Sequence, residues 1–173
     1  LVYAQMSAMR KAGQTAYVLP IWNKDLLPCE LSSCNDGVAD GVWGNVVDHG
    51  TYSMRPQHRA NLVQLVTWAV QLGFERITVR FVYNGDPESW TSWNEMAYQK
   101  AWNFIADART SAADAFHVAW GKRVASSFPV LMFDLGGEQA GIDAALAGPF
   151  IQRLWSDYVS SFGREDTVGF SFA

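Results

Sequence analysis

Stretches with apolar residues at helical spacing alternate along this chain with short, continuous apolar runs. The helical stretches cover residues 3–12, residues 56–72, a long stretch that opens at the segment 92–95 and runs to about 126, and residues 143–162. The apolar runs follow them at residues 16–22, 77–83, 130–135 and 167–172. Apolar positions three and four residues apart predict helices, and short apolar runs between turn signals predict buried strands. The pattern therefore predicts four helices and four strands in alternation.

Glycines and one polar tetrapeptide mark the ends of the predicted helices. Gly13, Gly73 and Gly163 each follow a helical stretch, where a glycine commonly ends a helix. Residues 92–95, Ser-Trp-Asn-Glu, have the form of a capping box in which Ser92 and Glu95 would satisfy the first amide groups of the third helix.

The alternation predicts an α/β fold with parallel strands. Parallel neighbours need right-handed crossovers, and helices serve as those crossovers while covering the sheet. A chain of 173 residues with 49% hydrophobic residues is long enough for a single domain. A doubly wound, flavodoxin-like sheet is one arrangement of this size, and a partial β/α barrel is another.

The connecting segments differ greatly in length. Each link from a helix to the next strand is only a few residues long, whereas the link after the first strand runs from Asn23 to about Arg55. Ligands of parallel sheets bind at the carboxyl ends of the strands. The polar and aromatic residues expected there are Trp22, Asn23, Asp25, Trp43, His49, Asn84, Asp86, Trp90, Trp93, Asp134, Glu138 and Gln139.

Residues 129–141 are the strongest candidate for chemistry, because an apolar run ends there in Asp134, two glycines and Glu138. Alternation along the strands puts Arg80 and Asp134 on the partly polar side of the sheet, so neighbouring strands would let them pair. A strand-centre arginine is usually walled in, and a purely structural ion is the alternative interpretation of Arg80.

The abundance of tryptophan fits a carbohydrate ligand. The chain has eight Trp, and an indole stacks on the apolar face of a sugar while amides and acids bond its hydroxyls. Trp22, Trp43, Trp90 and Trp93 fall near the expected binding end, with Trp90 the favoured contact. Packing beneath the long loop is the alternative role for each of them.

Other classes of partner and cofactor are not indicated. The net charge of −4 comes without a cluster of basic residues, which argues against nucleic acid. No apolar run reaches the roughly 20 residues of a membrane-spanning helix. The glycines at 136–137 lack the spacing of a dinucleotide-binding loop. Asp25, Asp86 and Asp134 come from three separate connections, where solvated loop acids are the commoner explanation, so we expect no cofactor and no metal.

The two cysteines, Cys29 and Cys34, lie in one loop segment with four residues between them. This spacing allows a small disulfide, which would suit a secreted or periplasmic protein, and a pair of free thiols is the alternative.

Three segments resemble a known family. The sequences at 79–81, 84–95 and 133–138 are similar to strands three and four of a clan-A glycoside hydrolase, a (β/α)8 barrel. The resemblance implies that Glu138 is the general acid/base of a glycosidase acting on a polysaccharide. In that clan an Asn precedes this Glu, whereas Gly137 stands here, so the role of the Asn is unfilled.

The resemblance covers only part of a barrel. A complete barrel has eight strands and about 250 residues, and the clan's second carboxylate comes from a later strand with no counterpart here. The chain is therefore expected to be a single α/β domain, a fragment of a larger barrel, or a half completed by a second polypeptide. The candidate substrate-binding residues, chosen for their positions on the strands and at the strand ends, are Trp22, Asn23, Arg80, Asn84, Trp90 and Asp134. A noncatalytic domain that binds carbohydrate or a partner is the alternative function.

Overall fold

The fold is α/β, as the sequence predicts. The computed structural model describes residues 1–23, 42–44, 46–48, 50–83, 92–121, 129–137, 144–163 and 167–170. The elements in chain order are α1 (Val2–Lys11), β1 (Ala16–Asn23), β2 (Trp43–Gly44), α2 (Pro56–Leu72), β3 (Arg76–Tyr83), α3 (Glu95–Gly121), β4 (Val130–Gly137), α4 (Ala144–Phe162) and β5 (Thr167–Gly169).

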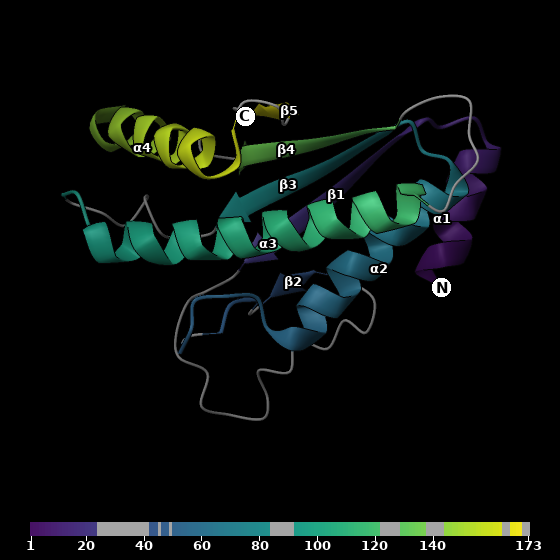
Figure 1. The fold of residues 1–173 in the computed structure, drawn as a ribbon, viewed down its shortest axis with the longest axis horizontal. Helices are drawn as coiled ribbons and strands as arrows, with labels where there is room; N and C mark the ends of the chain where they lie inside the picture. The colour runs from purple at the N-terminus through teal and green to yellow at the C-terminus, as the bar shows by residue number, and fades with distance from the viewer. Residues whose placement is uncertain are drawn as a thin grey trace.

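The strands form one sheet in the order β2-β1-β3-β4-β5, and every pairing is parallel. From β1 to β5 the longer strands follow one another in chain order, with α2, α3 and α4 between them. Right-handed crossovers that all step in the same direction place their helices on the same face. Figure 1 shows α2 and α3 side by side across one side of the strands.

The sequence pattern missed β2. Residues 23–55 read as a continuous link, but Trp43–Gly44 form a short strand in which Trp43 pairs with Trp22 and Gly44 with Asn23. Two residues are too few to show a hydrophobic period, and this strand exists because it adds to the end of β1. The predicted count of four strands was therefore wrong, because the sheet also contains this short edge strand.

The three predicted glycine stops are confirmed. Gly13, Gly73 and Gly163 have φ of 91°, 90° and 76°, a left-handed conformation that glycine adopts without a Cβ clash. At the end of α2, the amides of Gly73 and Phe74 donate to the carbonyls of Val70 and Ala69, both at 3.1 Å. This closure turns the chain at once into the next strand, which explains the short link from α2 to β3. The helix predicted to run to about 126 is described only as far as Gly121, and residues 122–128 lie outside the described part.

The predicted capping box at the start of α3 is wrong. Asn94 is the capping residue, because its Oδ1 accepts a hydrogen bond from the Ala97 amide at 3.1 Å. The Glu95 carboxylate instead accepts hydrogen bonds from Trp93 Nε1 at 2.9 Å and from Gln99 Nε2 at 3.0 Å. The tetrapeptide marks the right place, but the helix starts two residues later than a Ser92 cap would put it.

The hydrophobic core lies between the sheet and the helices. Odd-numbered residues of β1, β3 and β4 point into it, among them Ile21, Val79, Phe81 and Phe133, which are fully or almost fully buried. Phe81 packs edge to face on Phe104 of α3, with ring centroids 5.9 Å apart. Burying an aromatic side chain of this size contributes about 2–3 kcal/mol, so this face accounts for much of the stability.

The opposite face of the sheet has no helix on it among the described residues. We call it the open face, and it carries the even-numbered residues of β1, β3 and β4. Val18, Trp22 and Val130 are 49%, 40% and 41% exposed there. A doubly wound sheet has helices on both faces, so the described part of the chain is wound on one side.

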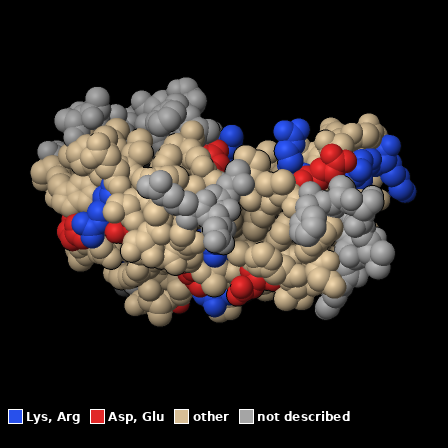
Figure 2. Space-filling model, turned by 45° about the horizontal axis from the view of Figure 1, so that its top comes forward, with Lys and Arg blue, Asp and Glu red and all other residues tan. Residues whose placement is uncertain are grey.

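Charged residues are spread over the surface. On the face drawn in Figure 2, basic and acidic side chains lie in small mixed groups separated by uncharged surface. Among the described residues, no helix is long and apolar enough to cross a membrane.

Candidate functional site

The predicted pairing of Arg80 with Asp134 is confirmed. Arg80 on β3 lies directly beside Asp134 on β4, and both side chains are on the open face. Arg80 Nε donates a hydrogen bond to Asp134 Oδ2 at 2.8 Å. A carboxylate and a guanidinium at this distance neutralise each other and fix each other's orientation.

The two partners differ in burial. Asp134 is only 8% exposed, whereas the side chain of Arg80 is 41% exposed. The expectation that Arg80 is walled in is wrong, because no described element covers the open face above it. The guanidinium is therefore held at its Nε end while its far end lies near solvent.

A β-bulge follows Asp134 immediately. Arg80 pairs with Asp134 but Val82 pairs with Gly137, so β4 has one more residue than β3 over this interval. The Gly136 amide donates to Asp134 Oδ1 at 3.3 Å. Bulges bend a strand and re-aim the residues beyond it. Asp134 thus stabilises both the bulge and the contact with Arg80.

This geometry decides what Asp134 can do. Each of its carboxylate oxygens accepts a hydrogen bond, one from a cation and one from a backbone amide. A carboxylate held by donors serves as an acceptor and an orienting group, and such an arrangement does not suit a proton donor. The proton-donor role is therefore better sought on another acid.

Trp22 lies near the carboxyl end of β1 on the same open face. It pairs in register with Val82 of β3 and is 40% exposed. Asn23, the last residue of β1, pairs with Tyr83 and with Gly44, and its side chain lies outside the described part of the structure. The structure therefore brings Trp22, Arg80 and Asp134 to the carboxyl half of one face.

Several predicted residues lie outside the described residues. These are the catalytic candidate Glu138, the binding candidates Asn84 and Trp90, the cysteines Cys29 and Cys34, and Asp25, His49, Asp86 and Gln139. Their roles, and the disulfide, stay predictions. β4 ends at Gly137, the residue that precedes Glu138 in the chain.

Trp93 has a packing role, which was its alternative interpretation. Its ring lies 5.5 Å from that of the fully buried Tyr98, and its Nε1 bonds Glu95. Tyr98 in turn donates to Asp157 Oδ2 at 2.6 Å, and Arg153 Nε donates to the same oxygen at 2.9 Å. This network joins the start of α3 to α4, and no sequence pattern indicated it.

The network shifts two pKa values. Burial and then the hydrogen bond to Asp157 raise the pKa of Tyr98 far above that of a free phenol. Burial raises the pKa of Asp157, but hydrogen bonds from Tyr98 and Arg153 outweigh it and leave the pKa below that of a free carboxyl. Both shifts favour the neutral phenol beside the ionised carboxylate.

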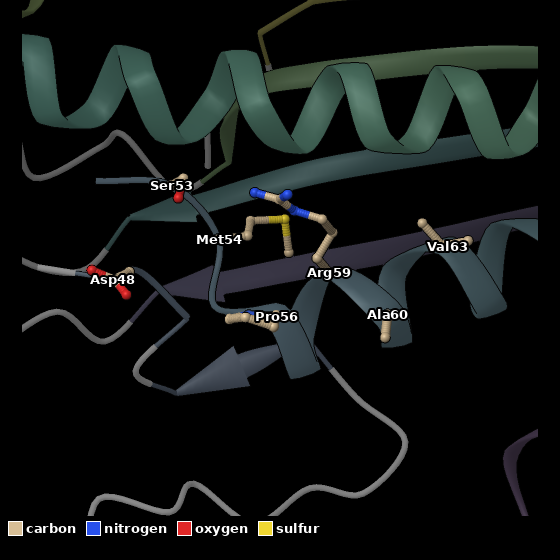
Figure 3. A pocket seen from close by; sticks show the side chains of 7 residues that line it. All are labelled: Asp48, Ser53, Met54, Pro56, Arg59, Ala60 and Val63. Atoms are coloured by element: carbon tan, nitrogen blue, oxygen red, sulfur yellow. The ribbon is translucent and has the colours of Figure 1, made fainter. Parts of the chain in front are cut away.

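A depression of about 450 Å³ lies at the start of α2, away from the open face (Figure 3). Its lining residues are Asp48, Ser53, Met54, Pro56, Arg59, Ala60 and Val63. Arg59 Nη2 donates to Asp107 Oδ2 of α3 at 2.7 Å, and the Met54 amide donates to the same oxygen at 2.8 Å. These contacts fix the turn before α2 onto α3, so the polar groups here hold the helix layer together.

Asp48, which also lines this depression, stabilises the turn that follows it. Its Oδ1 accepts hydrogen bonds from the amides of Gly50 and Thr51, and these bonds lower the pKa of the carboxyl. An aspartate that bonds the backbone two residues ahead stabilises a turn. Of the residues that the structure describes, none predicted from the sequence as catalytic or substrate-binding is among those that line this depression.

Among the described residues, no group of His, Cys, Asp and Glu side chains is arranged to hold a metal ion. Comparison with family models, curated proteins and solved structures finds no match. The residues at the carboxyl end of the open face are therefore the candidates for a functional site.

Proposed function

We propose that this chain is a glycoside hydrolase-like unit that acts on a polysaccharide, with Glu138 as the general acid/base. The observation that supports it most is the clamped end of β4. Arg80 and the Gly136 amide hold Asp134 at the bulge, and the strand ends one residue before Glu138. Parallel β/α sheets place catalytic groups at this end of their strands.

The proposed chemistry assigns one role to each group. Glu138 protonates the glycosidic oxygen as the bond to the leaving sugar breaks, and later takes a proton from the attacking water. Arg80 and Asp134 orient the site, and Trp22 and Trp90 supply apolar surfaces for the sugar ring. Asn23 and Asn84 bond its hydroxyls. A second carboxylate is required, and we propose that it comes from a part of the barrel beyond these four β/α units.

The partial-barrel form of the proposal has its own support. β1, β3, β4 and β5 are adjacent in chain order with their helices on one face, which is how consecutive units of a (β/α)8 barrel are arranged. The open face then corresponds to the lining of the barrel. Further strands from another polypeptide or another segment would cover it. A secreted or periplasmic location, with a disulfide between Cys29 and Cys34, belongs to the same proposal.

The decisive test is Glu138→Gln, which keeps the size of the side chain but removes its acid. Release of reducing ends from a panel of soluble polysaccharides should fall by at least about a hundredfold, the usual contribution of a general acid. Glu75→Gln is the matched control, because Glu75 lies at the opposite end of the sheet and is exposed. Equal turnover by the Glu138 variant and the unmutated chain would remove Glu138 from the mechanism.

A noncatalytic carbohydrate-binding domain is the second candidate. The half-exposed Trp22 favours it, because an indole beside an open sheet can bind a sugar ring without any acid. This function predicts saturable sugar binding without release of reducing ends, and binding that weakens in Trp22→Ala or Trp90→Ala.

A further inference from the structure

Among the residues that the structure describes, the exposed charge on the open face is positive. Arg76 and Arg80 lie four residues apart on β3, and alternation along the strand puts both side chains on this face. Arg76 is exposed, and the side chain of Arg80 is 41% exposed. Asp134, the acid on the described part of this face, is only 8% exposed. The face therefore presents cations to solvent, although the chain as a whole has a net charge of −4.

The guanidinium of Arg80 is oriented by Asp134. Its hydrogen bond to Asp134 Oδ2, at 2.8 Å, is made through Nε. A guanidinium also carries donors on its two Nη atoms, and these form a fork that can bind both oxygens of a carboxylate. Because Nε is held by a buried acid, the Nη fork is the part of the side chain that can meet a ligand. A group fixed in this way loses less conformational entropy on binding than a loose side chain.

Two apolar rings lie beside Arg80 on β1. Pro20 is its register partner and is exposed, and Trp22, two residues further along the strand, is 40% exposed. Strands about 4.8 Å apart that rise about 3.3 Å per residue put the Cα atoms of Arg80 and Trp22 roughly 8 Å apart. One sugar ring can therefore stack on the indole while a substituent of the same ring reaches the guanidinium.

We infer that the ligand of this face is an acidic polysaccharide, and that the carboxylate of one of its uronic acid units binds the Nη fork of Arg80. The inference rests on the proposed function and names its substrate class. A uronic acid combines the two features that these side chains recognise, an apolar ring face for Trp22 and a planar carboxylate for Arg80. A neutral sugar offers the ring face but leaves the guanidinium without an anion.

Arg76 separates specific recognition from general attraction. It carries the same charge on the same face, about 13 Å from Arg80 along β3. Its register partners are Ala16 and Val130, and neither is an acid that could orient it. An arginine in this setting attracts anions mainly through its charge. Arg76→Met is therefore the matched control for Arg80→Met.

Isothermal titration calorimetry with three pairs of polymers tests the inference. Polygalacturonate, alginate and hyaluronate are each compared with their methyl ester, which has the same backbone without the charge. The unmutated chain should bind at least one acid form about tenfold more tightly than its ester, because the ester loses a charged hydrogen bond. Arg80→Met should abolish this preference, and Arg76→Met should keep it. Arg80→Lys keeps the charge but not the fork, so it should lose most of the preference. Far-UV circular dichroism checks that the variants are folded.

Equal binding of acid and ester in all three pairs overturns the inference, and this comparison needs no variant. A preference that Arg76→Met reduces as much as Arg80→Met also overturns it, because general attraction then explains the binding.

Release of reducing ends distinguishes the inference from the proposed function. Binding that selects the acid form, without release of reducing ends, supports the carboxylate site and counts against Glu138 as a catalyst. Hydrolysis that is equally fast on acids and esters, and that is lost in Glu138→Gln, supports the proposed function and overturns the inference.

Discussion

The two faces of this sheet differ in how much of their side-chain surface is buried, although they share the same backbone. On the helix-covered face, Ile21, Val79, Phe81 and Phe133 are almost fully removed from water. On the open face, Val18, Trp22 and Val130 keep 49%, 40% and 41% of their surface exposed. The covered face therefore explains why the chain folds, and the open face carries the groups that can meet a ligand or a partner.

The largest effect should come from the covered face. Phe81→Ala removes a fully buried ring that packs on Phe104 and should cost about 3–5 kcal/mol in the free energy of unfolding. Val18→Ala on the open face should cost less than about 1 kcal/mol, because its side chain is already half exposed. Urea unfolding of the two variants and of the unmutated chain gives both values. Similar losses at the two sites would mean that the open face is covered in solution.

A smaller effect is expected from the charged pair of the open face. Asp134→Asn weakens the bonds to Arg80 and to the Gly136 amide and should cost about 1–2 kcal/mol. The coupling energy with Arg80→Met, from a double-mutant cycle, should be about 1 kcal/mol or less, because the exposed guanidinium is screened by solvent. A coupling near zero would show that Asp134 matters only through the bulge.

The smallest effect should come from Asp157 on the helix-covered side, through the pH dependence of the free energy of unfolding. The folded pKa of Asp157 lies below the unfolded value of about 3.9. Its ionised form therefore stabilises the fold above that pH, and the contribution is lost as the pH falls through the folded pKa. Urea midpoints at neutral pH and near pH 3 should differ less in Asp157→Asn than in the unmutated chain. An unchanged difference would assign the acid sensitivity to other carboxyls.

The features set by local or periodic signals were predictable from the sequence. Three helices end at left-handed glycines, and the four main strands carry continuous apolar runs, so both were correctly placed. The pairing of Arg80 with Asp134 followed from strand alternation, since both precede the bulge. Features that depend on a distant partner were missed. β2 exists through its pairing with β1, and the Asp107 carboxylate joins Met54 and Arg59, which lie about fifty residues earlier in the chain.

The candidate site was predictable only in part. Strand parity located Arg80 and Asp134 and indicated their side of the sheet, but it could not show that Arg80 is half exposed. That exposure depends on whether a second layer covers the face, which no pattern within a strand records. Asn94 rather than Ser92 caps α3, while Trp93 packs on Tyr98 and bonds Glu95, and the tetrapeptide alone does not reveal these contacts.

The bulge in β4 means that a single extra residue decides which side chains of this strand face each side of the sheet. Before it, even-numbered side chains face the same side as Arg80; after it, the odd-numbered Gly137 takes the place opposite Val82. Removing one residue between Asp134 and Gly137 would restore an unbroken hydrogen-bond ladder. The residues that follow would then point their side chains to the opposite face of the sheet. A one-residue deletion here would therefore exchange which side chains face each side of the sheet at the end of the strand, although every remaining residue keeps its identity.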